Sequence, residues 1–339
     1  MYLPETNGGR PARAALGRAK RDRDNALAEE PANSSTARGG NTLSSHVFSV
    51  NGEETLLDGR PVLIRGLRCS NALISDATAD DLIAHLDEYR SYGLNCISVY
   101  FMGSRFGDVK GYNEDASLSA EHAARMGRIV EAADECSMVV LVGCLYWGNS
   151  RAKWESWTQR QANDAVAGTA RWLAGNDFLN TFVDVDNEGM ALRGAGFDNR
   201  RMVLAAREAG SPVPVAVNYH GDPPPEADLT IHHSPPVPGK PYIESEGSPG
   251  DVPTGDGYWG SYSKREGLYG YTNVGVYAEA MKESQKRATR EHLDAGRGYM
   301  LASTWLQAPP PQGPNHNPGG RGTEDDPGVR WWLDWLKEG

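Results

Sequence analysis

Residues 137–188 read "SMVVLVGCLYWGNSRAKWESWTQRQANDAVAGTARWLAGNDFLNTFVDVDNE", which is two apolar runs separated by an amphipathic segment. The runs at 137–147 and 181–186 are short and mostly apolar, as expected of strands that are buried on both faces. Residues 159–174 carry apolar side chains at helical spacing. Because parallel strands need a long crossover, this order predicts a strand–helix–strand unit in a parallel sheet.

The same alternation extends along most of the chain and predicts eight strands. The six further strand candidates lie near residues 61–67, 94–101, 213–219, 227–233, 240–246 and 298–305. Further helices are predicted near 78–93, with Thr78 as N-cap, and near 118–135, 197–209 and 273–295. Eight strands alternating with helices favour a single (β/α)8 TIM barrel, an α/β fold, over an open sheet.

Two connections are too short for this scheme. The segments between the fifth, sixth and seventh strand candidates hold only about eight residues each, which is less than a helical crossover needs. We therefore expect the fifth and sixth helices to be reduced or absent. Residues 46–67, with the turn pairs Asn51-Gly52 and Asp58-Gly59, predict an N-terminal hairpin that leads into the first strand.

Residues 1–45 differ from the rest of the chain. They are almost free of large apolar residues, so we expect a disordered leader at 1–45 and one barrel domain at 46–339. The leader lacks the apolar core of a secretory signal, which leaves localisation open between the cytoplasm and secretion by an unseen route. The sequence does not predict an oligomeric state.

Charge and motifs restrict the classes of partner. The chain carries a net charge of −11, which argues against a nucleic-acid partner, because phosphate binding depends on Lys and Arg. No apolar run is long enough to span a membrane. The four cysteines have no metal-type spacing, and neither GxGxxG nor GxxxxGK[ST] occurs, so we expect no cofactor and no metal.

Polar residues gather at the carboxyl ends of the predicted strands, where barrel enzymes place their active sites. One carboxylate there can simply cap the next helix, but polar clusters after six strands together indicate a site. The clusters are "RGLRCSN" at 65–71, "DNE" at 186–188, "NYHGD" at 218–222, "HHS" at 232–234, "ESE" at 244–246 and "TWLQ" at 304–307. Strands four and seven lie across the mouth from each other, so Glu188 and Glu246 could face one bond, as glycoside hydrolysis requires.

"DNE" closing the fourth strand and "PYIESEG" closing the seventh resemble clan A glycoside hydrolases, the cellulase superfamily of retaining (β/α)8 barrels. "DGRPVLIRGL" at 58–67 and "YGLNCISVY" at 92–100 are similar to the first two strands of that clan, and the resemblance covers about residues 46–339. It implies that Glu188 is the acid/base, that Asn187 contacts the sugar 2-hydroxyl, and that Glu246 is the nucleophile. Glu244, which shares the strand alternation of Glu246, is the alternative nucleophile.

The resemblance also implies substrate contacts. His232 corresponds to the clan's His or Tyr on strand six, and Trp305 to the aromatic platform after strand eight. Many members carry an Arg near the end of strand two that supports the charge of the nucleophile. Here Ser98 stands at that place, so either Arg65 or Arg68 from strand one substitutes or the subsite is built differently.

Aromatic loops favour a carbohydrate partner, since flat rings stack on the C–H faces of sugars. Trp147 after strand three, with Tyr258 and Trp259 after strand seven, are candidates for such stacking. Asn218 and His220 after strand five complete the predicted binding set. Together these residues predict a poly- or oligosaccharide substrate.

Two alternatives remain open at the level of sequence. One is a non-catalytic carbohydrate-binding barrel that kept the cleft. The other is a metal-dependent barrel hydrolase, which needs matched ligands, whereas the adjacent His232 and His233 should point to opposite faces of a strand. The acid/base role further predicts that the charge of Glu246 raises the pKa of Glu188.

Overall fold

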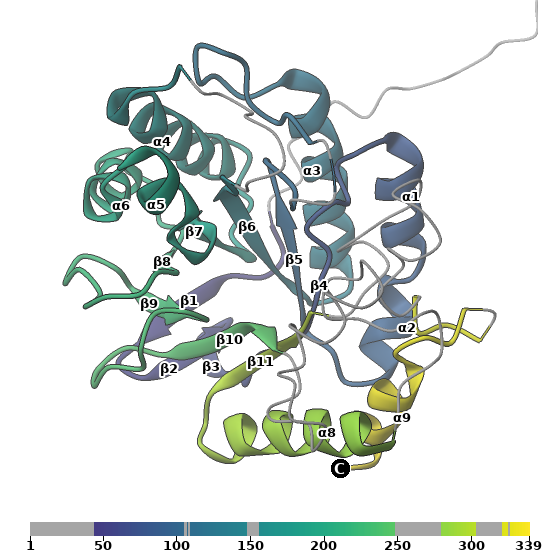
Figure 1. Ribbon diagram of the computed structural model, residues 1–339. Coiled ribbons are helices and arrows are strands. Elements are labelled where there is room, and N and C mark those ends of the chain that lie inside the picture. Colours follow the sequence, from purple (N-terminus) through teal and green to yellow (C-terminus); the bar gives the residue numbers. More distant parts are fainter. Residues whose placement is uncertain are drawn as a thin grey trace, which may run out of the picture. The chain divides into compact units, whose positions relative to one another are not determined.

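The computed structural model describes residues 44–104, 107, 109–147, 156–247, 279–302, 321–324 and 326–339. Eight parallel strands close into a barrel in chain order, with the last strand pairing to the first (Figure 1). The predicted (β/α)8 barrel is confirmed. Its strands are β4 (Arg65–Arg68), β5 (Cys96–Tyr100), β6 (Val139–Leu145), β7 (Thr181–Asp186), β8 (Val215–Val217), β9 (Leu229–Ile231), β10 (Tyr242–Gly247) and β11 (Gly298–Leu301).

Helices pack around the barrel where the sequence predicts most of them. None within the described ranges has the length and apolarity needed to cross a bilayer. The helical elements are α1 (Asp76–Ala84), α2 (Leu86–Ser91), α3 (Ala120–Glu135), α4 (Gln159–Gly175), the 3-10 turn η1 (Asn187–Gly189), α5 (Met190–Ala195), α6 (Asn199–Glu208), α8 (Glu279–Asp294) and α9 (Arg330–Glu338).

The first predicted helix is wrong at its start and in its continuity. Its N-cap is Ser75, whose side chain accepts the backbone N–H of Thr78, and Thr78 returns a bond to the Ser75 N–H. This reciprocal pair is a capping box, in which Thr78 is the third helical residue and not the cap. The helix then breaks at His85 into α1 and α2, and the short α5 is a helix that the sequence pattern did not predict.

The two short crossovers behave as predicted. Residues 218–228 between β8 and β9, and residues 232–241 between β9 and β10, are fully described and contain no helix. These connections therefore stay close to the barrel mouth. Residues 273–278 of the predicted long helix lie outside the described residues, and α8 accounts for the rest.

The predicted N-terminal hairpin is present as a three-stranded antiparallel sheet of β1 (Phe48–Asn51), β2 (Glu54–Leu57) and β3 (Arg60–Pro61). The Phe48 N–H donates to the Leu179 carbonyl at 2.8 Å, and its ring lies 5.1 Å from that of Phe182. The hairpin thus packs against the start of β7, at the amino end of the strands.

The predicted boundary at residue 45 between leader and barrel stays a prediction. Most of the leader lies outside the described residues, but the backbone N–H groups of Ser45 and His46 donate to the carboxylate of Asp134 at 2.6 and 3.0 Å. Asp134 lies in the last turn of α3, and its carboxylate accepts the hydrogen bonds of these backbone N–H groups. These contacts hold Ser45 and His46 against α3.

Candidate active site

Arg68, at the carboxyl end of β4, is buried inside the barrel beside Glu246 of β10. Its Nη2 lies 3.1 Å from Glu246 Oε2, and the two side chains are 0% and 1% exposed. Nη2 also donates to Asn187 Oδ1 at 2.7 Å, and Nη1 donates to the Ser245 carbonyl at 3.2 Å. The guanidinium lies over the Tyr100 ring, 5.0 Å from its centre. One cation therefore links three strands and is paired with the predicted nucleophile.

Arg65, the other candidate substitute for the missing strand-two Arg, lies away from this pair. Side chains alternate along a strand, so positions 65 and 68 fall on opposite faces of β4. Arg65 lines a cavity with Arg290 of α8 and Trp335 of α9 on the outer face. Ser98 pairs with Arg68 in the sheet register, so the cation lies one strand away from where the resemblance placed it.

A β-bulge in β10 separates Glu246 from Glu244. Glu244 is opposite Tyr299 and Gly247 is opposite Leu301, so Ser245 and Glu246 together face the single residue Met300. Such a bulge re-aims a side chain. Glu246 turns inward to Arg68, whereas Glu244 lies on the outer side of β10 with Tyr299. The expectation that both glutamates share one face is therefore wrong.

The Glu244 carboxylate positions two neighbouring groups through hydrogen bonds. Its Oε1 lies 2.5 Å from His232 Nδ1 and accepts the backbone N–H of Glu246 at 2.9 Å. Burial raises the pKa of Glu244, but the charge and hydrogen bond of His232 outweigh burial and lower that pKa to about 2. The same contact raises the pKa of His232 to about 9, against the effect of burial. Glu244 thus holds both His232 and the backbone of the bulge.

Glu188 follows β7 in a left-handed backbone conformation with φ 54°, and Gly189 continues it with φ 62°. A non-glycine residue in this region is strained, which is common at functional sites. The turn brings Glu188 Oε2 to 3.6 Å from His233 Nε2 and 3.9 Å from Arg193 Nη2. The Glu188 side chain is 12% exposed, so its carboxylate is largely shielded from water.

Asp186, at the end of β7, binds N–H groups at the start of α5. It thus fills the helix-capping role that was the alternative to a chemical role for the carboxylates after β7. Its Oδ1 accepts the Ala191 N–H at 2.8 Å, and its Oδ2 accepts the Leu192 N–H at 3.1 Å and the Asn199 amide at 3.1 Å. Burial nevertheless raises the pKa of Asp186 to about 7. Because the neighbouring acid caps the helix, Glu188 is left to point toward the histidines.

Asn187 and Asn218 join the network from β7 and from the end of β8. Asn187 Oδ1 accepts from Arg68 and, at 3.3 Å, from Asn218 Nδ2. Asp184 Oδ2 accepts from Tyr100 at 2.8 Å and from Asn218 at 3.3 Å. Within the described residues, Asn187 Nδ2 is buried and has no hydrogen-bond partner. It is therefore a donor that a bound ligand could satisfy.

The pKa values of the two glutamates run opposite to the sequence expectation. Burial and the nearby charge of Glu188 raise the pKa of Glu246 to about 7, although Arg68 opposes the rise. Burial also raises the pKa of Glu188, but His233, His232 and Arg68 outweigh it and lower that pKa to about 2. The sequence pattern does not show that the two histidines lie beside Glu188. The two carboxyl groups interact, and Glu246 keeps its proton to higher pH than Glu188 does.

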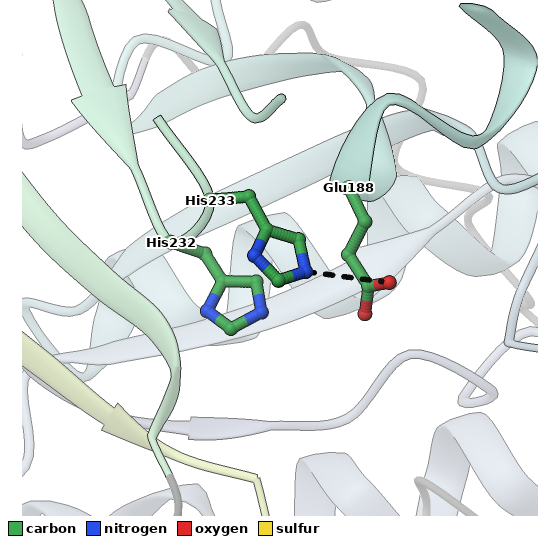
Figure 2. Close-up of side chains that lie close together, drawn as sticks. All are labelled: Glu188, His232 and His233. Atoms are coloured by element: carbon green, nitrogen blue, oxygen red, sulfur yellow. Dashed lines mark ion pairs between the residues drawn. The ribbon is translucent and has the colours of Figure 1, made fainter. Parts of the chain in front are cut away.

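His232 and His233 lie side by side, as Figure 2 shows. Their ring centres are 4.1 Å apart, and both rings approach Glu188, with one ligand atom from each residue within 4.8 Å of the others. The expectation of opposite faces fails because His232 has a left-handed backbone (φ 47°), which breaks the strand alternation. His220 is exposed, and its ring centre lies 4.1 Å from that of His233.

The predicted aromatic platforms are only partly described. Trp147 is half-buried and packs on Trp157 and Phe197, with ring centres 5.9 and 5.3 Å apart. Trp305, Tyr258 and Trp259 lie outside the described residues.

Sequence reasoning missed three residues of the cluster, Tyr100, Asp184 and Arg193, and it missed the approach of His233 to Glu188. Asp184 could have been found, since it lies two residues from Phe182 on the same face of β7. The others depend on turns that bring separate segments together.

Comparisons with known proteins give matches in structure alone. No family model matches the chain, and no curated protein matches its sequence. A solved structure described as a glycoside hydrolase aligns with a TM-score of 0.52 at 14% identity, over 80% of this chain and 68% of that one.

Two further solved structures have informative names. The exo-beta-1,4-mannosidase Op5Man5 from Opitutaceae bacterium strain TAV5 aligns with a TM-score of 0.58 at 13% identity, over 88% of this chain and 61% of that one. An endocellulase from Pyrococcus horikoshii, analysed in complex with cellotetraose, gives 0.53 at 11% identity, over 88% and 99%. At this level of identity the matches establish a shared barrel fold.

Proposed function

We propose that the chain is a retaining glycoside hydrolase that cleaves O-glycosidic bonds in a poly- or oligosaccharide, with Glu246 as nucleophile and Glu188 as acid/base. The observation that carries this proposal is the pair of mutually interacting carboxyl groups from facing strands. Arg68 is paired with Glu246, and Asp186 takes the capping role that Glu188 would otherwise fill. The fold, shared with glycoside hydrolases and an endocellulase, supports the same reading.

The reaction proceeds by double displacement. In the first step Glu246 attacks the anomeric carbon while Glu188 gives its proton to the leaving glycosidic oxygen, and a glycosyl ester forms on Glu246. In the second step Glu188 takes a proton from water, the water oxygen attacks the anomeric carbon, and Glu246 leaves as a carboxylate. The negative charge of Glu246 at the start and end is stabilised by Arg68 at 3.1 Å.

The proton has to move from Glu246 to Glu188 before this cycle begins. In the free chain it resides on the side of Glu246, whereas the first step needs it on Glu188. A glycosidic oxygen bound beside Glu188 accepts a hydrogen bond only from the protonated acid, so substrate binding favours moving the proton there. Once Glu246 is esterified its charge is gone, and Glu188 ionises more easily as the base.

Asn187 gives the site a place for the sugar 2-hydroxyl. Its buried Nδ2 has no hydrogen-bond partner within the described residues, and its Oδ1 is fixed by Arg68 and Asn218. A hydroxyl acceptor there would satisfy a donor whose burial otherwise costs about 1–3 kcal/mol. Because the similar structures include a β-1,4-mannosidase and an endocellulase, β-1,4-linked mannosides and glucosides are the first substrates to test.

The test compares Glu188→Gln with Glu246→Ala on aryl glycosides and on polysaccharides. Glu188→Gln should keep its fold and cleave activated aryl glycosides in the first step, yet fail on natural glycans with poor leaving groups. Glu246→Ala should lose turnover and regain it with azide, giving an inverted glycosyl azide. The matched control is Asp186→Ala, which should instead lose stability, typically by about 1 kcal/mol, because it removes the acceptor of the N–H groups at the start of α5.

Other outcomes would replace the proposal. If Glu188→Gln loses stability and retains its rate on glycans, Glu188 is structural and the mechanism is wrong. If sugars bind without turnover, and the loss of either glutamate changes nothing, the chain is a carbohydrate-binding barrel. If a chelator abolishes turnover, the chain is a metal-dependent hydrolase.

A further inference from the structure

We propose that Glu188, His232 and His233 form a binding site for a divalent transition-metal ion, best matched by Zn²⁺, and that an ion bound there inhibits turnover. The binding half of this inference stands on the geometry alone. The inhibition half rests on the proposed function, because it depends on Glu188 acting as the acid/base. Figure 2 shows the three side chains converging from the end of β7 and from the turn after β9.

The donor atoms fit a zinc ion in type and spacing. Each residue offers one ligand atom, and all three lie within 4.8 Å of one another. Ligand atoms of a tetrahedral zinc ion lie about 3.4 Å apart, since zinc–nitrogen bonds are about 2.0–2.1 Å. His233 Nε2 and Glu188 Oε2, at 3.6 Å, already have this separation. The ligand atom of His232 lies within 4.8 Å of the other two, so it has to move closer to them by at most about 1.4 Å to reach this separation.

Glu244 completes the site from behind. It binds His232 Nδ1 at 2.5 Å, which leaves Nε2 as the ligand atom of that ring. Metal-binding histidines usually place their second nitrogen against a carboxylate in this way, which fixes the ring and strengthens the ligand. The arrangement of Glu244 is independent of any ion, because the same oxygen also accepts the Glu246 N–H.

Two residues of the cluster have a strained backbone conformation, which brings the ligand atoms together. Glu188 and His232 both have left-handed backbones, with φ 54° and φ 47°, and without the second turn His233 and His232 would face opposite sides. The rings instead lie beside the carboxylate with their centres 4.1 Å apart and their planes tilted by 37°. Two imidazoles and a carboxylate are one of the donor sets that hold zinc in proteins.

Inhibition follows from which atom the ion takes. A cation bound to Glu188 occupies the oxygen that must carry the proton to the leaving group, so the first step cannot proceed. The Glu246 carboxylate would remain, since Arg68 holds it through separate atoms. An ion therefore acts as a block that competes with the proton of Glu188, and removal of the ion restores the enzyme.

Binding is tested on the full chain by titration with Zn²⁺ and, separately, by the visible absorption of Co²⁺ bound in tetrahedral geometry. His233→Gln should weaken Zn²⁺ binding at least ten-fold by removing a ligand. Glu244→Gln should weaken it by roughly 10–100-fold, as expected when the outer partner of a histidine ligand is lost. The matched control is His122→Ala, because His122 bonds to Ser119 at the start of α3, away from the cluster.

Equal Zn²⁺ affinity in all four proteins, or Co²⁺ absorption that survives His233→Gln, would overturn the site. Since Glu244→Gln can loosen the bulge, far-ultraviolet circular dichroism is recorded beside each titration. The Asn variant His233→Asn keeps a polar side chain of smaller reach, and it gives a second test if His233→Gln does not fold.

Turnover separates the two halves of the inference. Zn²⁺ should inhibit hydrolysis with the same dissociation constant found by titration, and EDTA should restore full activity. Activation by Zn²⁺, or Zn²⁺ bound at the site with no effect on rate, would overturn inhibition and leave the site standing. If Zn²⁺ binds but no glycoside is cleaved under any condition, the proposed hydrolase fails and inhibition fails with it, while the metal site is supported.

Discussion

Replacing Arg68 by Met should destabilise the fold in a way that depends on pH. The substitution keeps most of the aliphatic bulk but leaves Glu246 buried without its cation at 3.1 Å, and breaking one side of a buried ion pair costs about 3–5 kcal/mol. Folding already raises the pKa of Glu246 from 4.5 to about 7, so ionising it costs roughly 3 kcal/mol more in the folded chain than in the unfolded one. Without Arg68 that pKa rises further.

The sign follows from this direction. A carboxyl group whose pKa is higher in the folded state is protonated in both states below pH 4.5, and its contribution to stability is lost as pH rises through the folded pKa. The variant should therefore resemble the wild type most closely near pH 5 and fall furthest below it at pH 8 and above. With Glu246 as the proposed nucleophile, the acid limb of the kcat/KM profile should move to higher pH, since that role requires the carboxyl group to ionise.

Urea unfolding at pH 5 and pH 8 measures the difference. The matched control is Arg65→Met, which removes the same side chain from the outer face of β4 and should show little pH dependence of its effect. The double variant Arg68→Met with Glu246→Gln should recover part of the loss at pH 8, because no buried charge is left unpaired. A loss in Arg68→Met that is equal at both pH values and unchanged by Glu246→Gln would refute the reasoning.

Three other predictions concern the interior of the barrel and the start of α1. Gly143→Ala should destabilise by about 1–3 kcal/mol or more in urea unfolding and disturb the site, because a Cβ there would lie 1.8 Å from the Tyr100 ring; full stability would contradict the inward position of Tyr100. Ser75→Ala should lower the free energy of unfolding by about 1 kcal/mol in the same assay, because it removes the helix cap. Ser75→Asp should lower it less, because Asp is also a good capping residue. Burial raises the pKa values of the Cys96 and Cys144 thiols, that of Cys144 to about 12. Both thiols should therefore react with a thiol reagent only at the rate of unfolding. A fast reaction in the folded chain would show that they are accessible.

Much of the barrel can be predicted from the sequence because its signals are local. Continuous apolar runs such as 139–145 require burial on both faces, and the short segments after β8 and β9 cannot hold a helix whatever they contact. Ser75 was missed in favour of Thr78 because both are good capping residues. Only the reciprocal bonds between them show which one begins the helix.

The site was predicted less fully because its geometry depends on exceptions to strand periodicity. The bulge that turns Glu246 inward exists only in the pairing of β10 with β11, which no single segment encodes. The left-handed conformations of Glu188 and His232 occur at non-glycine residues, and the surrounding structure imposes them. The reversed pKa values of the glutamates follow from that second turn, because it brings His232 and His233 to Glu188 together.

The two ends of the described chain lie on the same side of the barrel. Ser44 donates to Asn180 just before β7, and Gly339 lines a cavity with Leu63 just before β4, so both are at the amino ends of the strands. The carboxylate pair lies at the opposite, carboxyl ends. Anchoring Gly339 to a bead, or fusing a partner module to it, would therefore hold the barrel by its base and leave the mouth directed outward, open to an insoluble polymer.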